Sequence, residues 1–198
     1  MLYNLLVPLA DEFGPLNLFR YVTFRTGAAM MTALFVSFML GQPVINWLKA
    51  QQGKGQPIRA LGPERHLIEK QGTPTMGGFL ILLALSVATL LWGDLTNPYI
   101  WVMLLVTLGF GGIGFADDYL KVTRQSSDGI HGRVKLLLEF TVAGVAVFYL
   151  MQLGEGSNGS ALAVPLFKDF FINLGWFFLP FGMFIIVGAS NAVNLTDG

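Results

Sequence analysis

The chain has 198 residues, of which 54% are hydrophobic and 12% are charged, and its mean hydropathy is +0.61. A soluble domain of this size carries about 25% charged residues, so the composition indicates a membrane protein. The formal net charge is zero, which argues against a nucleic-acid-binding protein, because such proteins carry basic faces. The chain has no cysteine, which excludes disulfides and thiolate metal sites.

Five apolar runs approach or exceed the roughly 20 residues that a helix needs to cross a bilayer. They are preceded by residues 1–18, which lack the basic region and cleavage site of a signal peptide, and we expect a short interfacial lead-in there. The predicted spans are 22–45, 76–92, 99–116, 136–153 and 174–193, the second being the shortest. The predicted fold class is therefore an all-α, polytopic integral membrane helical bundle, with residues 1–198 forming a single membrane domain.

Basic residues are unevenly distributed between the connections. Connections 46–75 and 117–135 hold nine of the twelve Lys and Arg residues, whereas 93–98 holds none and 154–173 holds only Lys168. By the positive-inside rule, the two basic connections face the cytoplasm. The N-terminus is then predicted outside, and the polar end of the chain is predicted inside.

The first cytoplasmic connection is rich in Gly, Pro and charge. Pro57, Pro63 and Pro74 forbid a long helix, so an extended loop is expected. Thr73 or Thr75 can cap the helix that follows, and the free N–H groups of that helix then form an anion site.

Asp117 and Asp118 close an apolar run that carries no other charge from Pro98 onward. On translocon scales a charged side chain at a helix centre costs roughly 2.5–3.5 kcal/mol. Adjacent residues diverge by about 100° on an ideal helix, so both carboxyl groups reach one ligand only at a frayed helix end, where we place them. Their mutual repulsion would be relieved by Mg²⁺ or by a lysine. We predict a divalent cation held against a phosphate; the alternative is two solvated carboxylates at the membrane edge.

Asn191, Asn194 and Asp197 follow the last apolar run at a spacing of three, which places them along one helical face. Such a strip suits a ribose, a uracil edge or a hydrated cation. Hydrogen bonding between membrane helices explains the same spacing equally well.

The basic residues near these segments are Lys70, Lys121, Arg124, Arg133 and Lys135. Topology and attraction to anionic lipid, at about 1 kcal/mol per residue, explain most of them. Lys70 is the exception we favour, because it directly precedes the Gly-rich lead-in to the second span.

The remaining polar and glycine-rich features have simpler interpretations. His66 and His131, the two histidines, lie in cytoplasmic loops without a metal-binding spacing, and we expect them to be solvated. The glycines of LGFGGIGFADD are expected to let neighbouring helices approach closely.

Three segments together resemble the phospho-N-acetylmuramoyl-pentapeptide transferases, which belong to the polyprenyl-phosphate hexose-1-phosphate transferases of glycosyltransferase family 4. They are KQGTPTMGG at 70–78, GFADDYLK at 114–121 and NAVNLTDG at 191–198. The resemblance implies Mg²⁺-dependent transfer of phospho-N-acetylmuramoyl-pentapeptide from its UDP-linked form to undecaprenyl phosphate, giving lipid I and UMP. It implies a multi-pass protein of the bacterial inner membrane whose partners are these two substrates and the bilayer. No nucleic acid is implied, and a homodimer stays open.

The resemblance also implies roles for individual residues. Asp117 and Asp118 are implied as catalytic residues and as the magnesium ligands. The implied substrate-binding residues are Lys70, Thr75, Lys121, Arg133, Lys135, Asn191, Asn194, Leu195, Asp197 and Gly198. Among them, Lys121 with Arg133 or Lys135 would meet phosphates, and the segment from Asn194 would meet the nucleoside.

The resemblance has one important departure. The family has about ten spans and this chain has five, so we expect a fragment that is inactive alone. Two other functions remain open: an N-acetylglucosamine-1-phosphate transferase of the same superfamily, and an ion-coupled membrane transporter. A transporter predicts acidic residues near mid-bilayer, whereas these lie at one rim.

Overall fold

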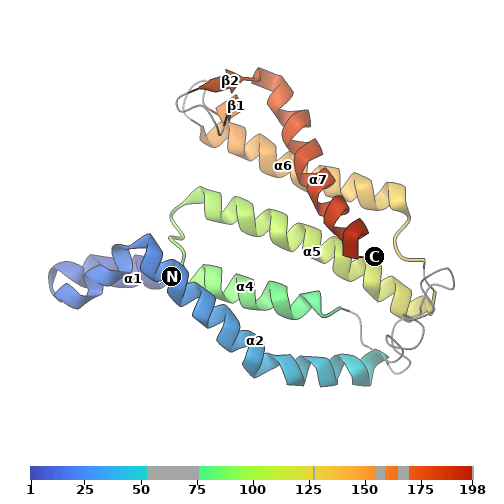
Figure 1. Ribbon diagram of the computed structural model, residues 1–198, viewed down its shortest axis with the longest axis horizontal. Helices are drawn as coiled ribbons and strands as arrows, with labels where there is room; N and C mark the ends of the chain where they lie inside the picture. Colours follow the sequence, from blue (N-terminus) through green and yellow to red (C-terminus); the bar gives the residue numbers. More distant parts are fainter. Residues whose placement is uncertain (53–75, 127, 155–158, 165–169, 198) are drawn as a thin grey trace. The chain divides into compact units, whose positions relative to one another are not determined.

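The computed structural model describes residues 1–52, 76–126, 128–154, 159–164 and 170–197 (Figure 1). They divide into an N-terminal unit, Met1–Ile100 with Gly111–His131, and a C-terminal unit, Trp101–Phe110 with Gly132–Gly198. The elements in chain order are α1 (Leu2–Leu6), η1 (Val7–Asp11), η2 (Gly14–Arg20), α2 (Val22–Gln52), α4 (Gly78–Trp92), α5 (Pro98–Arg124), α6 (Gly132–Leu153), β1 (Ala161–Ala163), β2 (Phe171–Asn173), η4 (Gly175–Phe177) and α7 (Phe178–Asp197).

Four helical segments in the described part of the chain are long and apolar enough to cross a bilayer: α2, α5, α6 and Gly175–Leu195, which consists of η4 and most of α7. The fifth, α4, is apolar but has 15 residues. At 1.5 Å per residue it is about 22 Å long, which is less than the hydrocarbon thickness of about 30 Å. The prediction of an all-α polytopic membrane protein is confirmed, and the shortest predicted span is the one that falls below spanning length.

Most helices continue beyond the predicted spans. α2 extends to Gln52, α5 extends to Arg124, α6 begins at Gly132 and α7 extends to Asp197. The predicted limits follow the fall in hydropathy, but Lys, Arg and Leu are good helix formers and carry a helix past the apolar region. The connection predicted at 117–135 is therefore only 125–131, and it starts at Gln125, whose left-handed backbone (φ 48°, ψ 40°) ends α5.

In the N-terminal unit, α2 and α4 lie side by side (Figure 1). Trp92, at the end of α4, fixes this contact. Its indole Nε1 donates a hydrogen bond to Thr32 Oγ1 at 2.9 Å. Its ring stacks on Phe19 at 5.8 Å between centroids and meets Phe24 edge-on at 6.0 Å. One aromatic side chain thus joins η2 to both helices.

The connection between α4 and α5 also anchors the N-terminal segment. Asn4 Nδ2 donates to Asp94 Oδ1 at 2.9 Å, and Asn4 Oδ1 accepts from the Leu95 N–H at 3.0 Å. Desolvation raises the pKa of Asp94, but hydrogen bonds from Thr96 and Asn4 outweigh it and hold that pKa below its ordinary value of 3.8. The lead-in is therefore a folded segment attached to this connection.

The C-terminal unit is built on the pair α6 and α7. Small residues allow the two helices to approach: a Cβ added to Gly182 would lie 3.0 Å from both γ carbons of Val147, which is 2% exposed. Gly109 likewise allows α5 to approach α6, since a Cβ added to it would lie 2.7 Å from Val142 Cγ1. The predicted close approach of the glycine-rich run is thus confirmed at Gly109.

A short antiparallel pair of strands, β1 and β2, connects α6 to α7, with Leu162 opposite Ile172. The sequence did not predict it, because three-residue strands are too short to give a period-2 pattern.

Candidate active site

Asp117 and Asp118 lie inside α5, and the helix continues for seven residues after Asp117, to Arg124. The prediction that they sit at a frayed helix end is therefore wrong. The residues that follow them keep the helix regular, and Lys121 and Arg124 lie in its last turn, where cations interact favourably with the helix dipole. The two aspartates must reach a common partner in another way.

Lys121 is that common partner. Its Nζ lies 2.5 Å from Asp117 Oδ2 and 3.6 Å from Asp118 Oδ1. Spacings of four and three residues bring the lysine to the same face of the helix as each aspartate in turn. Of the two ways foreseen to relieve the repulsion between the carboxylates, the structure contains the lysine.

The connection that follows α5 folds back onto Asp117. The backbone N–H of Ile130 donates to Asp117 Oδ1 at 2.7 Å. Gly129 lies against the same carboxyl group: a Cβ there would overlap Asp117 Oδ1 and would come within 2.9 Å of Lys121 Cε. A side chain at position 129 would therefore displace the Asp117 carboxyl group or the Lys121 side chain from its present position.

The two aspartates differ in accessibility. The side chain of Asp117 is 13% exposed and that of Asp118 is 31% exposed. Asp117 is held by a backbone donor and by the lysine, whereas Asp118 lies farther from the ammonium group. Asp118 is thus the more accessible of the two carboxylates.

The donor set at these aspartates suits a hard divalent cation. Among the described residues no group of three His, Asp or Glu side chains is arranged to hold a metal. Mg²⁺, however, is commonly bound through one or two protein carboxylates, with substrate phosphates and water completing its shell. Asp117 and Asp118 fit that requirement.

A second polar cluster lies in the C-terminal unit. Asn191 Nδ2 donates to Glu139 Oε2 at 2.5 Å and to the Val187 carbonyl at 3.0 Å. Lys135 Nζ lies 4.0 Å from Glu139 Oε1. Asn191 therefore forms a hydrogen bond between membrane helices, one of the two interpretations that its spacing left open, and Lys135 faces a carboxyl group of its own helix.

The other predicted substrate-binding residues are distributed as follows. Arg133 is exposed on the first turn of α6, and Asn194 and Leu195 are exposed near the end of α7. Lys70, Thr75, Gly198 and the side chain of Asp197 lie outside the described residues, as do Thr73 and His66. Their roles stay predictions.

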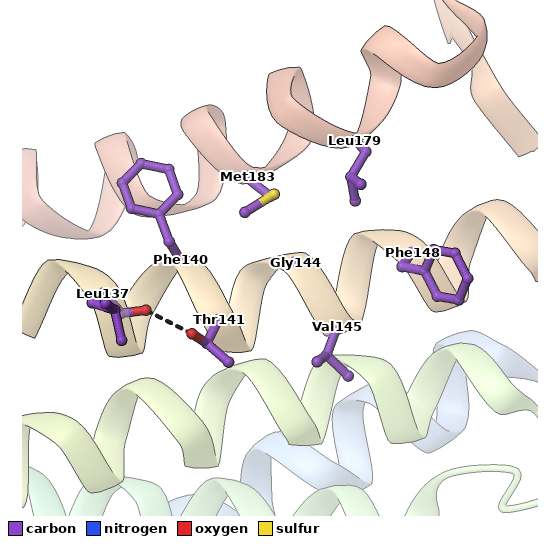
Figure 2. Close-up of a pocket in the computed structure, with 8 residues that line it drawn as sticks. All are labelled: Leu137, Phe140, Thr141, Gly144, Val145, Phe148, Leu179 and Met183. Atoms are coloured by element: carbon purple, nitrogen blue, oxygen red, sulfur yellow. Dashed lines mark hydrogen bonds between the residues drawn. The ribbon is translucent and has the colours of Figure 1, made fainter.

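An apolar pocket of about 580 Å³ lies between α6 and α7 (Figure 2). Its lining consists of Leu137, Phe140, Thr141, Gly144, Val145, Phe148, Leu179 and Met183. The single hydroxyl among them, on Thr141, donates to the Leu137 carbonyl at 2.8 Å. This pocket offers no charged group to a phosphate, so the aspartates with Lys121 are the better candidate site.

Comparison with known families decides the classification. The family model described as glycosyl transferase family 4 matches residues 100–198, which is half of the chain. The chain belongs to glycosyl transferase family 4. Signature 1 of the phospho-N-acetylmuramoyl-pentapeptide-transferases matches residues 70–82, which comprise the Gly-rich segment before α4 and the start of α4. The resemblance inferred from the three segments is confirmed.

Two curated relatives are similar along the whole chain. Both carry the name phospho-N-acetylmuramoyl-pentapeptide-transferase: one from Maricaulis maris (strain MCS10), 58% identical over 203 residues, and one from Granulibacter bethesdensis (strain ATCC BAA-1260 / CGDNIH1), 58% identical over 198 residues. Each alignment covers 100% of this chain and 55% of the relative. The chain thus spans about half the length of the curated relatives it matches.

Sequence reasoning missed three participants in these clusters. Glu139 carried a usable signal, since it is the one acidic residue within the predicted span 136–153. Gly129 follows an aspartate in a polar connection, which marks a turn but not its contact. The Ile130 N–H carried no signal, because a backbone donor is common to almost every residue.

Proposed function

We propose that the full-length gene product transfers phospho-N-acetylmuramoyl-pentapeptide from its UDP-linked form to undecaprenyl phosphate, releasing UMP and forming lipid I. The observation that carries this proposal is the Asp117–Lys121–Asp118 cluster on a helix of membrane-spanning length, within the region matched by the family model. The names of the two relatives and the signature at 70–82 support the choice of substrate.

The chemistry suits this cluster. Phosphoryl transfer depends on positioning and on neutralising charge, and an attacking lipid phosphate is already ionised. Mg²⁺, held by Asp117 and Asp118, would neutralise the negative charge of the diphosphate. Lys121, which lies between the carboxylates, is close enough to neutralise part of the charge of a phosphate bound there.

The remaining roles follow from the family resemblance. Arg133, exposed on α6, is proposed to contact a phosphate, and Asn194 and Leu195 are proposed to contact the nucleoside. Lys70 and Thr75, with Asp197 and Gly198, complete the proposed substrate-binding residues. The site is proposed to face the cytoplasm, where sugar nucleotides are present.

The test is a transfer assay on the full-length gene product in lipid vesicles. With UDP-N-acetylmuramoyl-pentapeptide, undecaprenyl phosphate and Mg²⁺, we expect equal amounts of UMP and a lipid-linked phospho-sugar. Chelation should stop the reaction, and added Mg²⁺ should restore it. Product formation from UDP-N-acetylglucosamine alone would instead assign the N-acetylglucosamine-1-phosphate transfer activity. The absence of UMP with both donors would exclude a transferase.

A further inference from the structure

Glu139 is a buried acidic residue that the proposed chemistry does not use. It lies on α6 two turns after the helix start, and it is 3% exposed. Ala143, one turn later on α6, and Val187, which accepts from the same asparagine as Glu139 does, are buried apolar residues. A carboxyl group in such a place is unfavourable unless polar partners compensate for the loss of water, and an apolar side chain would need none.

The partners of Glu139 come from two helices. Asn191 of α7 donates to it at 2.5 Å across the helix pair, and Lys135 lies one turn earlier on α6 at 4.0 Å. The second hydrogen on Asn191 Nδ2 goes to Val187, one turn earlier on α7. Both amide hydrogens of Asn191 are therefore engaged, and its side chain has one orientation.

Asn191 is also where α7 leaves the helix pair. Val187 is buried and Asn191 is partly buried, whereas every residue of 192–195 is exposed, with Val193 at 63% and Leu195 at 80%. The bond to Glu139 therefore joins α7 to α6 directly before the exposed residues that include Asn194 and Leu195. Residues 192–195 continue the same helix after Asn191, so a bond that holds Asn191 against α6 also influences the direction of this exposed turn.

We propose that Glu139 is a positioning residue: its carboxyl group holds Asn191, and thereby orients the exposed turn 192–195 toward the substrate. The proposal rests on the proposed function, in which Asn194 and Leu195 contact the nucleoside. Residue 139 itself does not touch the substrate, so the expected effect of changing it is on substrate binding.

The kinetic test uses three variants of the full-length gene product in vesicles. Glu139→Gln keeps an oxygen that accepts from Asn191, whereas Glu139→Met removes the acceptor and keeps a side chain of similar length. Val147→Ala is the matched control, because it loosens the same helix pair at the contact with Gly182, away from the polar cluster.

We expect Glu139→Met to raise the KM for the UDP-sugar about 10-fold with a smaller change in kcat. Glu139→Gln and Val147→Ala should each leave the KM within about twofold of the unsubstituted protein, although Val147→Ala lowers the Tm. An unchanged KM in Glu139→Met, or an equal rise in Val147→Ala, would show that residue 139 has no positioning role.

A second readout does not depend on activity. Residues 1–198 contain no cysteine, so Val193→Cys provides a single attachment point for a nitroxide on the exposed turn once any cysteine outside them has been replaced by serine. We expect the mobility of the label to increase in the Glu139→Met background and to be unchanged in the Glu139→Gln and Val147→Ala backgrounds. Equal mobility in all four proteins would overturn the proposal. If the unsubstituted protein released no UMP, the proposed function would fail, and this measurement would still decide whether Glu139 orients the turn.

Discussion

Asp117 and Asp118 are adjacent in the chain, yet their carboxyl groups have different surroundings. Asp117 accepts from the Ile130 N–H and pairs with Lys121 at 2.5 Å, and Asp118 is more exposed and lies 3.6 Å from the same ammonium group. Asp117 therefore holds the connection 125–131 against α5 and also forms part of the candidate site. The second has the greater access to a ligand.

Replacing either carboxylate should stop the proposed transfer while keeping the shape of the side chain. We expect Asp117→Asn and Asp118→Asn each to lower kcat by about 100-fold or more, because a neutral amide no longer holds a cation or offsets its charge. Lipid-linked product formed by the full-length gene product is the measurement. Asp128→Asn, an exposed acid in the next connection, is the control and should keep its activity. Near-normal turnover in either variant would remove that residue from the site.

Gly129 tests whether the connection must lie against Asp117. Gly129→Ala places a methyl group where the Asp117 carboxyl and Lys121 Cε now lie, so one of these groups has to move. We expect the transfer rate to fall by about 10-fold or more, because a shift of about 1 Å in a site can have that effect. The matched control is Gly132→Ala at the start of α6, where nothing lies within 4 Å of the added carbon. Equal rates in the two variants would show that this contact does not matter.

Among the elements, the helices pack through glycines placed where a neighbour approaches. A Cβ at Gly109 would meet Val142 at 2.7 Å, whereas one at Gly112, three residues later on α5, would meet nothing within 4 Å. The same run of sequence thus contains a glycine that packing requires and another that it does not. The sequence indicated close packing for the run as a whole but could not separate the two.

This difference predicts opposite effects on stability. Gly109→Ala should destabilise the protein by about 1–3 kcal/mol through overpacking against Val142. Gly112→Ala should be neutral or stabilising, since alanine favours a helix over glycine by roughly 0.8–1.0 kcal/mol. Thermal unfolding in detergent measures both, and Val142→Ala should restore the stability lost in Gly109→Ala. A lower Tm in Gly112→Ala than in Gly109→Ala would contradict this packing.

At the scale of the whole molecule, the distribution of charge predicts how the chain crosses the membrane. The connection 93–97, between α4 and α5, contains no Lys or Arg, whereas Lys121, Arg124, Arg133 and Lys135 surround the connection 125–131. α5 separates the two connections, so they are expected on opposite sides of the bilayer.

Single cysteines test this topology, because residues 1–198 contain none and any cysteine outside them can be replaced by serine. In spheroplasts, an impermeant maleimide should label Thr96→Cys, and should label Asp128→Cys only after the membrane is opened. The reverse pattern would place the aspartates away from cytosolic sugar nucleotides and would contradict the proposed function.

Several features were predictable from the sequence because they depend on local composition. Apolar runs predicted the helices, and the shortest run became α4, which is shorter than a membrane span. The clustering of Lys and Arg predicts a topology that the labelling experiment tests. The pair Asp117–Asp118 stood out because it ends an uncharged run. Helix limits were less predictable, since hydropathy marks the edge of the apolar region and a helix continues for as long as its backbone hydrogen bonds are satisfied.

Contacts between distant residues were decided only by the tertiary structure. The Ile130 N–H reaches Asp117 from 13 residues away, and Asn191 reaches Glu139 from 52 residues away. Neither partner can be read from spacing, because which donor satisfies a buried acceptor depends on how the chain folds back and on how closely two helices pack. Sequence determined which groups carry charge into the membrane region, and packing determined which atoms compensate for it.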